Sequence, residues 1–166
     1  MSPALLIDAY RFSHEHRRLE GVLPILELTR LADFLSEAEG EISWRLSGLS
    51  GERGQPRLRL AVTGVLSLRC QRCLDTVVET LAIDALLELV SGDAALAREE
   101  LENDCLDFLP MTGRMLDVKA LVEDEILLAL PVAPRHEECA LPLEAYAANG
   151  KPRPFAALAG FKGGHG

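Results

Sequence analysis

Apolar and polar residues alternate over two long stretches in the middle of the chain. In residues 57–68 every second residue is apolar, except where Gly64 interrupts the pattern. Arg57 and Arg59 occupy the alternate positions, so their side chains point to the opposite face. Strict alternation places successive side chains on opposite faces of a strand, so this stretch predicts a β-strand with one buried face. At Gly64 we expect a bulge or a close backbone approach. The apolar positions are Leu58, Leu60, Val62, Leu66 and Leu68.

Residues 77–90 alternate in the same way and follow after a short connection. Two such runs joined by a few residues predict an antiparallel pair, with Cys70 and Cys73 at one end of the sheet. Residues 41–49 predict a further half-buried strand, and the Gly- and Pro-containing loop at 50–56 predicts a turn.

Helical spacing of apolar residues occurs in two places. Residues 25–35 predict a short helix, and residues 117–130 predict a longer one that begins at the N-cap Asp117 and stops before Pro131. His14 and His16 alternate as on a strand, with surface positions expected. The polar stretch 91–102 predicts a loop or a short helix.

Together these elements predict an α+β protein, a single domain over residues 1–166. We expect a largely antiparallel β-sheet or a partly open barrel with a few packed helices. Prolines from Pro131 onward predict an irregular, Pro-rich C-terminal tail, which we expect to be flexible over about residues 155–166.

Charge narrows the possible partners, because the net charge is −9 and its distribution is uneven. Residues 45–73 carry six arginines and one acid, whereas residues 74–138 carry sixteen acids and four Lys or Arg. An acidic chain repels phosphate on average, so any RNA contact must be local. The acidic stretch, including Glu123, Asp124 and Glu125, suits either a basic partner, such as a ribosomal protein, or solvent.

No apolar run approaches the roughly 20 residues of a membrane span, and the N-terminus lacks the basic start of a secretory signal. We therefore expect a cytoplasmic protein whose cysteines are thiols or metal ligands. No phosphate-binding glycine loop, nucleophile elbow or HExxH motif occurs, so no catalytic residues are predicted.

The strongest local chemistry is the Cys-x-x-Cys motif of Cys70 and Cys73. Structural zinc takes four Cys or His ligands, and His136 with Cys139 has the matching spacing for a second pair, with Cys105 as a substitute. Two alternatives remain open, ordinary reduced thiols at a strand end and a thiol redox protein, although no βαβ pattern surrounds the motif.

Three blocks of the sequence resemble the YceD family of bacterial proteins. CQRCLD at 70–75 is similar to one hallmark, LDVKALVEDEILLALPVAPRHEEC at 116–139 to a second, and KPRPFAALAGFK at 151–162 to a C-terminal signature. The resemblance implies a non-enzymatic factor in synthesis, processing or stability of 23S ribosomal RNA and so in large-subunit ribosome biogenesis. Some relatives carry a cysteine-rich, zinc-binding-like segment after the proline stop, where this chain keeps only His136 and Cys139.

Our leading hypothesis is contact with large-subunit ribosomal RNA or a pre-50S particle through local cations. A protein-only adaptor that binds a ribosomal protein or a nuclease is the alternative. Neither a membrane nor a small-molecule substrate is expected. The candidate RNA contacts are Arg53, Arg57, Arg59, Arg69, Arg72, Lys151, Arg153 and Lys162.

Overall fold

The computed structural model describes residues 5–92 and 107–139, and strands dominate it. The N-terminal elements are β1 (Leu6–Asp8), α1 (Ala9–His14), β2 (Arg18–Pro24), the 3₁₀ turns η1 (Ile25–Glu27) and η2 (Thr29–Leu31), and β3 (Leu35–Glu37). They are followed by β4 (Glu41–Ser50), β5 (Pro56–Arg69), β6 (Thr76–Ser91), β7 (Asp107–Met111), β8 (Met115–Asp117) and α3 (Val118–Ala129).

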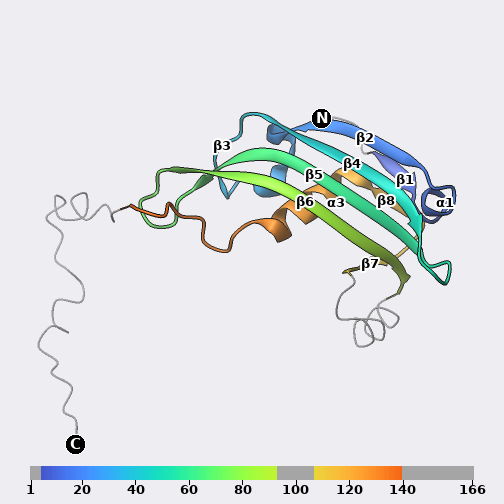
Figure 1. Ribbon diagram of the computed structural model, residues 1–166. Coiled ribbons are helices and arrows are strands. Elements are labelled where there is room, and N and C mark those ends of the chain that lie inside the picture. The colour runs from blue at the N-terminus through green and yellow to red at the C-terminus, as the bar shows by residue number, and fades with distance from the viewer. Residues whose placement is uncertain (1–4, 93–106, 140–166) are drawn as a thin grey trace, which may run out of the picture.

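A curved, open sheet forms the body of the protein (Figure 1). Its strand order is β2-β4-β5-β6-β7, and β3 pairs with the far end of β5. Neighbours are antiparallel except β6 and β7, which run parallel. Strands β1 and β8 pair separately. The prediction of a largely antiparallel sheet is confirmed, whereas the sheet does not close into a barrel.

The long β5–β6 hairpin follows directly from the alternating sequence pattern. Its register pairs Leu58 with Leu87 and continues without a shift to Arg69 and Thr76. Gly64 therefore does not mark a bulge; a Cβ there would lie 2.5 Å from the Ile42 side chain, so glycine permits a close approach. Strand β4 and the turn after it are likewise as predicted.

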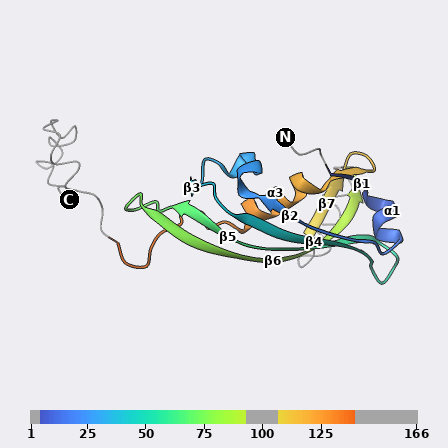
Figure 2. The same ribbon diagram turned by 90° about the horizontal axis from the view of Figure 1, so that it is seen from above.

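Most apolar side chains of the strands face one side of the sheet, where α1, α3 and the 3₁₀ turns cover them (Figure 2). Helix α3 begins as predicted, because the Asp117 carboxylate accepts hydrogen bonds from the backbone N–H groups of Lys119 and Ala120. The opposite face of the sheet is exposed. The largest fully buried side chains include Phe12, Ile25, Leu28, Leu31, Ile42, Leu46, Leu58, Leu60, Leu66, Leu68 and Ile126.

The helix predicted over residues 25–35 is wrong, because two 3₁₀ turns occupy its first half. Ile25, Leu28 and Leu31 are buried at a spacing of three residues. Three residues per turn align such positions on one side, whereas the 3.6 residues of an α-helix would rotate them apart. Strand β3 then begins at Leu35.

His14 and His16 are exposed, as expected, but they do not lie on a strand. Helix α1 ends at His14, and its N-cap Asp8 accepts a hydrogen bond from the Arg11 backbone N–H at 3.0 Å. His16 has a φ of 50°, which turns the chain into β2. The stretch expected at 91–102 and the tail expected at 155–166 lie largely or wholly outside the described residues.

Candidate functional site

The connection between β5 and β6 is a compact turn that carries Cys70 and Cys73. The Cys70 backbone N–H donates to the Asp75 carbonyl at 2.9 Å, and the Leu74 N–H donates back to the Cys70 carbonyl at 3.0 Å. Leu74 has a φ of 69°, a left-handed conformation that closes the turn. These bonds bring both cysteines to the same end of the sheet, as the sequence predicts.

The segment that follows α3 runs to this turn. The helix ends at Ala129, and the chain continues through Pro131 without further regular structure among the described residues. The Pro134 carbonyl accepts a 2.8 Å hydrogen bond from the Gln71 backbone N–H. Pro134 is buried, so this contact docks the segment on the hairpin and delivers His136 and Cys139 to the two turn cysteines.

Cys70, Cys73, His136 and Cys139 form a cluster whose ligand atoms all lie within 4.8 Å of one another. The Cys70 and Cys139 Sγ atoms are 3.7 Å apart, and Cys73 Sγ is 3.4 Å from His136 Nδ1. A tetrahedral zinc ion with bonds of about 2.3 Å to sulfur and about 2.0 Å to nitrogen spaces its ligands at about 3.5–3.8 Å. The donor set and the spacing therefore both fit a tetrahedral metal ion.

The ring of His136 is held in the orientation that such a site needs. Its Nε2 lies 2.9 Å from the Thr76 carbonyl oxygen, so Nε2 carries the proton and donates it. Nδ1 is then free to bind a metal ion, and a backbone carbonyl is a common outer partner of a ligating histidine. Cys70 is fully buried, whereas the other three residues are half-buried.

Backbone N–H groups favour negative charge on one sulfur of the cluster. Burial raises the pKa of the Cys70 thiol, but the backbone N–H groups of Cys73, Arg72 and His136 outweigh it and lower that pKa to about 5. For Cys73, the Asp75 N–H lowers the pKa, but burial and the neighbouring sulfurs raise it to about 11. Cysteine binds a metal ion as a thiolate, so a bound cation would displace the protons that remain on these sulfurs.

Arg72 is half-buried against this cluster and does not lie on an open surface. Its Nε donates to Cys139 Sγ at 3.0 Å, and Nη2 donates to the carbonyls of His136 and Glu137 at 3.0 and 3.2 Å. The guanidinium therefore holds the segment after α3 against the hairpin. A phosphate group would reach Arg72 only by competing with these contacts.

The other candidate RNA contacts divide into paired and unpaired arginines. Arg57 donates to the buried Glu88 at 2.6 Å, and Arg59 donates to Asp84 at 2.7 Å. Arg53 and Arg69 are exposed, and neither has an ion pair among the described residues. Lys151, Arg153 and Lys162 lie outside the described residues, as does Cys105.

The structure adds two arginines that the sequence pattern did not single out. Arg18 and Arg45 line a depression of about 280 Å³ on the exposed face of the sheet, together with Ser47, Arg59, Ala61 and Asp84. Arg45 pairs with Glu20, and Arg59 pairs with Asp84. Cross-strand register produces this grouping, because Ser47 pairs with Arg18 on one side and with Arg59 on the other. Only knowledge of the strand order could have revealed it.

The three acids of α3 do not form one solvated face. Glu123 is buried and accepts hydrogen bonds from the Arg30 backbone N–H at 2.7 Å and from Arg30 Nε at 3.0 Å. Asp124 accepts from Nη1 of the same arginine. The expectation that all three face solvent or a partner is therefore wrong for Glu123, because η2 supplies an internal cation.

These features define a class of protein: an open α+β sheet whose central hairpin meets a C-terminal segment at a Cys₃His cluster. The chain belongs to the family of the large ribosomal RNA subunit accumulation protein YceD, whose family model matches residues 58–162. The matched region contains most of β5, all of β6 and α3, and the whole cluster. This confirms the family resemblance of the sequence and, at family level, a role in ribosome biogenesis.

A search of curated proteins and a search of solved structures each found no match to this chain. Among the described residues, no helix is both long enough and apolar enough to cross a bilayer.

Proposed function

We propose that this protein is a non-enzymatic factor that acts in the cytoplasm in synthesis, processing or stability of 23S ribosomal RNA. The family match over residues 58–162 carries this proposal. In this proposal the protein binds large-subunit ribosomal RNA or a pre-50S particle.

The exposed face of the sheet and the hairpin turn offer a surface for such RNA. Arg53 and Arg69 are exposed and have no ion pair among the described residues, so phosphate groups can reach them at little cost. The guanidinium groups of Arg57, Arg59 and Arg72 already have partners, and the carboxylates of Glu88 and Asp84 offset the charges of the first two, so in this proposal these three arginines are secondary contacts. Lys151, Arg153 and Lys162 add three cations after the cluster.

The cluster of Cys70, Cys73, His136 and Cys139 is the proposed zinc site. Bound there, zinc supplies a structural cross-link and no reactive group, because all four positions are filled by protein ligands. Such an ion would hold the β5–β6 turn and the segment that leads to the C-terminal cations in a fixed relative position.

The test combines a deletion strain with crosslinking. Loss of the gene should lower the amount of 23S ribosomal RNA, and the unaltered protein should restore it and yield RNA adducts. An Arg53→Ala, Arg69→Ala variant should lose adducts, and the slope of its log affinity against log salt should fall by about 0.7–0.9 per lost phosphate contact. Arg11→Ala is the control for loss of a surface arginine, because Arg11 is also exposed but lies on α1, where it pairs with Glu15.

Two results would contradict the proposal. The first is normal 23S ribosomal RNA in the deletion strain together with no co-sedimentation with large-subunit precursors. The second is co-sedimentation that persists unchanged from low to high salt and is insensitive to the arginine substitutions, which would remove the cationic contacts from the proposal.

A further inference from the structure

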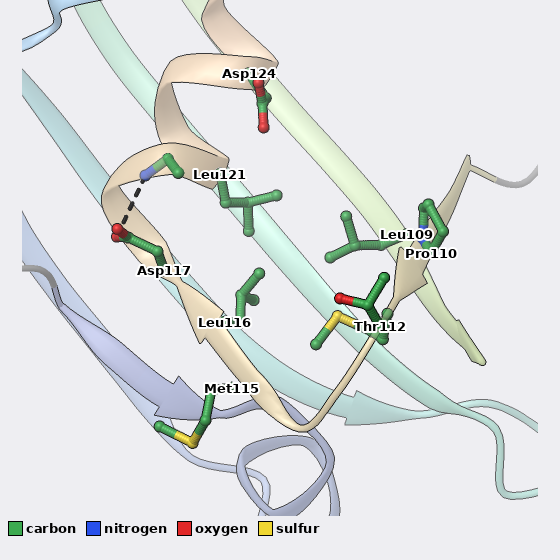
Figure 3. Close-up of a pocket in the computed structure, with 10 residues that line it drawn as sticks. Leu109, Pro110, Thr112, Met115, Leu116, Asp117, Leu121 and Asp124 are labelled. Carbon is green, nitrogen blue, oxygen red and sulfur yellow. Dashed lines mark hydrogen bonds between the residues drawn. The ribbon is translucent and has the colours of Figure 1, made fainter. Parts of the chain in front are cut away.

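A groove runs along the edge of the sheet between β7 and α3, away from the cysteine cluster. It consists of two adjoining hollows of about 800 and 170 Å³, which share Leu109, Pro110, Leu121 and Asp124. Figure 3 shows the side chains of the smaller hollow, with Leu121 of α3 facing Leu109 and Pro110 of the edge strand.

The floor of the groove is apolar. Leu121 and Leu87 are buried beneath it, Leu109 is half-buried, and Leu128 stands 79% exposed on the last turn of α3. Covering a leucine that is this exposed removes apolar surface from water and is therefore favourable in free energy. The groove therefore has room and apolar surface for one or two aliphatic side chains.

Among the described residues, every charged group at the rim of the groove is an acid. Asp107, Asp124 and Glu125 line it, and no Lys, Arg or His is among the lining residues. Asp124 is paired with Arg30, whereas no described cation pairs with Asp107 or Glu125. Partial burial raises the pKa of Glu125, and the charges of Asp107 and Asp124 raise it further. These carboxylates thus repel one another, and a cation placed between them would relieve that repulsion.

We propose that the groove between β7 and α3 binds a basic segment of a partner protein. One aliphatic side chain of the segment sits over Leu109 and Leu121 and covers Leu128, while flanking Lys or Arg side chains lie against Asp107 and Glu125. Charge complementarity selects this occupant over RNA, whose phosphates the rim repels. The inference goes beyond the proposed RNA contact and uses a different surface.

The test measures binding of a fluorescein-labelled peptide, in which single leucines are separated by pairs of lysines, to the full chain. Fluorescence polarisation at low salt should show saturable binding. A peptide with the same charge but serine in place of leucine should bind at least tenfold more weakly, because it cannot use the apolar floor. Equal binding of both peptides would indicate nonspecific attraction to an acidic protein and would overturn the proposal.

Variants of the groove separate binding from folding. Asp107→Asn with Glu125→Gln should weaken peptide binding about tenfold, and Leu128→Ser about fivefold. Glu125→Gln removes a carboxylate whose ionisation the fold disfavours, and Leu128 is exposed, so both variants should unfold at a urea concentration close to that of the parent. Glu39→Gln, an exposed acid in the turn before β4, is the control and should bind as the parent does. Unchanged affinity in the groove variants would refute the proposal.

Two other occupants would also overturn it. If the chain's own residues 93–106 fill the groove, Leu101→Ser with Leu106→Ser in the full chain should tighten peptide binding several-fold. If a second copy fills it, the mass in solution should rise with concentration, and Leu128→Ser should abolish that rise. No RNA is present in these assays, so their outcome is independent of the proposed RNA function.

Discussion

Glu123 stands in a run of three consecutive acids, yet it alone of the three is buried. Two hydrogen bonds from Arg30 satisfy its carboxylate, and they fasten η2 to α3. A buried carboxylate is tolerated only when it is paired in this way. Sequence alone could not separate Glu123 from Asp124 and Glu125, because the partner lies 93 residues away.

Replacing this carboxylate should destabilise the fold. Glu123→Ala removes both acceptors and leaves the Arg30 N–H without its partner, so the free energy of unfolding should fall by about 1–3 kcal/mol. Urea denaturation measures it. Glu39→Ala, an exposed acid, should change the stability by less than about 0.5 kcal/mol. Equal effects of the two substitutions would show that the Arg30 contact contributes nothing.

Asp8 should make the stability depend on acid. The Arg11 backbone N–H and then the Arg114 guanidinium hold the pKa of Asp8 below its ordinary value in the folded protein. Its stabilising contribution is therefore complete above the unfolded-state pKa and is lost as the pH falls through the folded-state pKa. Asp8→Asn keeps an acceptor for the cap but removes the charge, so it should be less stable than the parent at pH 7. Below both pKa values the two proteins should be equally stable; a difference that persists there would contradict this assignment.

At the level of elements, α1 lies so close to β4 that only glycine fits at position 48. A Cβ on Gly48 would meet the backbone of Phe12 and Ser13 in α1. Ser13 also donates its hydroxyl to the Leu49 carbonyl at 2.5 Å, which holds the helix against this strand. The contact places Phe12 in the core.

Gly48→Ala should therefore push α1 away from the sheet and cost about 1–3 kcal/mol of stability, as overpacking does elsewhere. Gly113→Ala is the control, because a Cβ at Gly113 meets nothing within 4 Å and its φ is not positive. Thermal unfolding of the two variants measures the difference. Equal midpoints would mean that α1 shifts at no cost.

The elements that the sequence predicted correctly share one property: each is marked by a pattern of residues within its own stretch of the chain. Alternation over β4, β5 and β6 and the N-cap of α3 needed no knowledge of the rest of the chain. Strand β7 escaped prediction because it is five residues long, contains Pro110 and pairs in parallel. The spacing of Cys70 and Cys73 and that of His136 and Cys139 predicted the two pairs of the cluster. Whether the two pairs come together depends on where α3 ends relative to the sheet, which the sequence does not show.

At the level of the whole molecule, the cluster joins the hairpin to the end of the described chain. Protein purified without an affinity tag should carry close to one zinc per chain, and less than about 0.1 per chain would be incompatible with a structural site. Cys139→Ser should lose the metal and, with zinc at a hundredfold over its Kd, about 3 kcal/mol of stability. Cys105→Ser, which leaves all four proposed ligands in place, should keep the metal.

The 69-residue separation of Cys70 and Cys139 also bears on how the protein opens. Metal held by both residues would enclose β6, β7, β8 and α3 in one closed loop, while β1, α1 and β2 stay outside it. Native-state amide hydrogen exchange should then reveal two cooperative units, with α1 and β2 exchanging faster than β6 and α3. Chelation should speed exchange mainly in the enclosed unit; uniform protection across both units would mean that the molecule opens all at once.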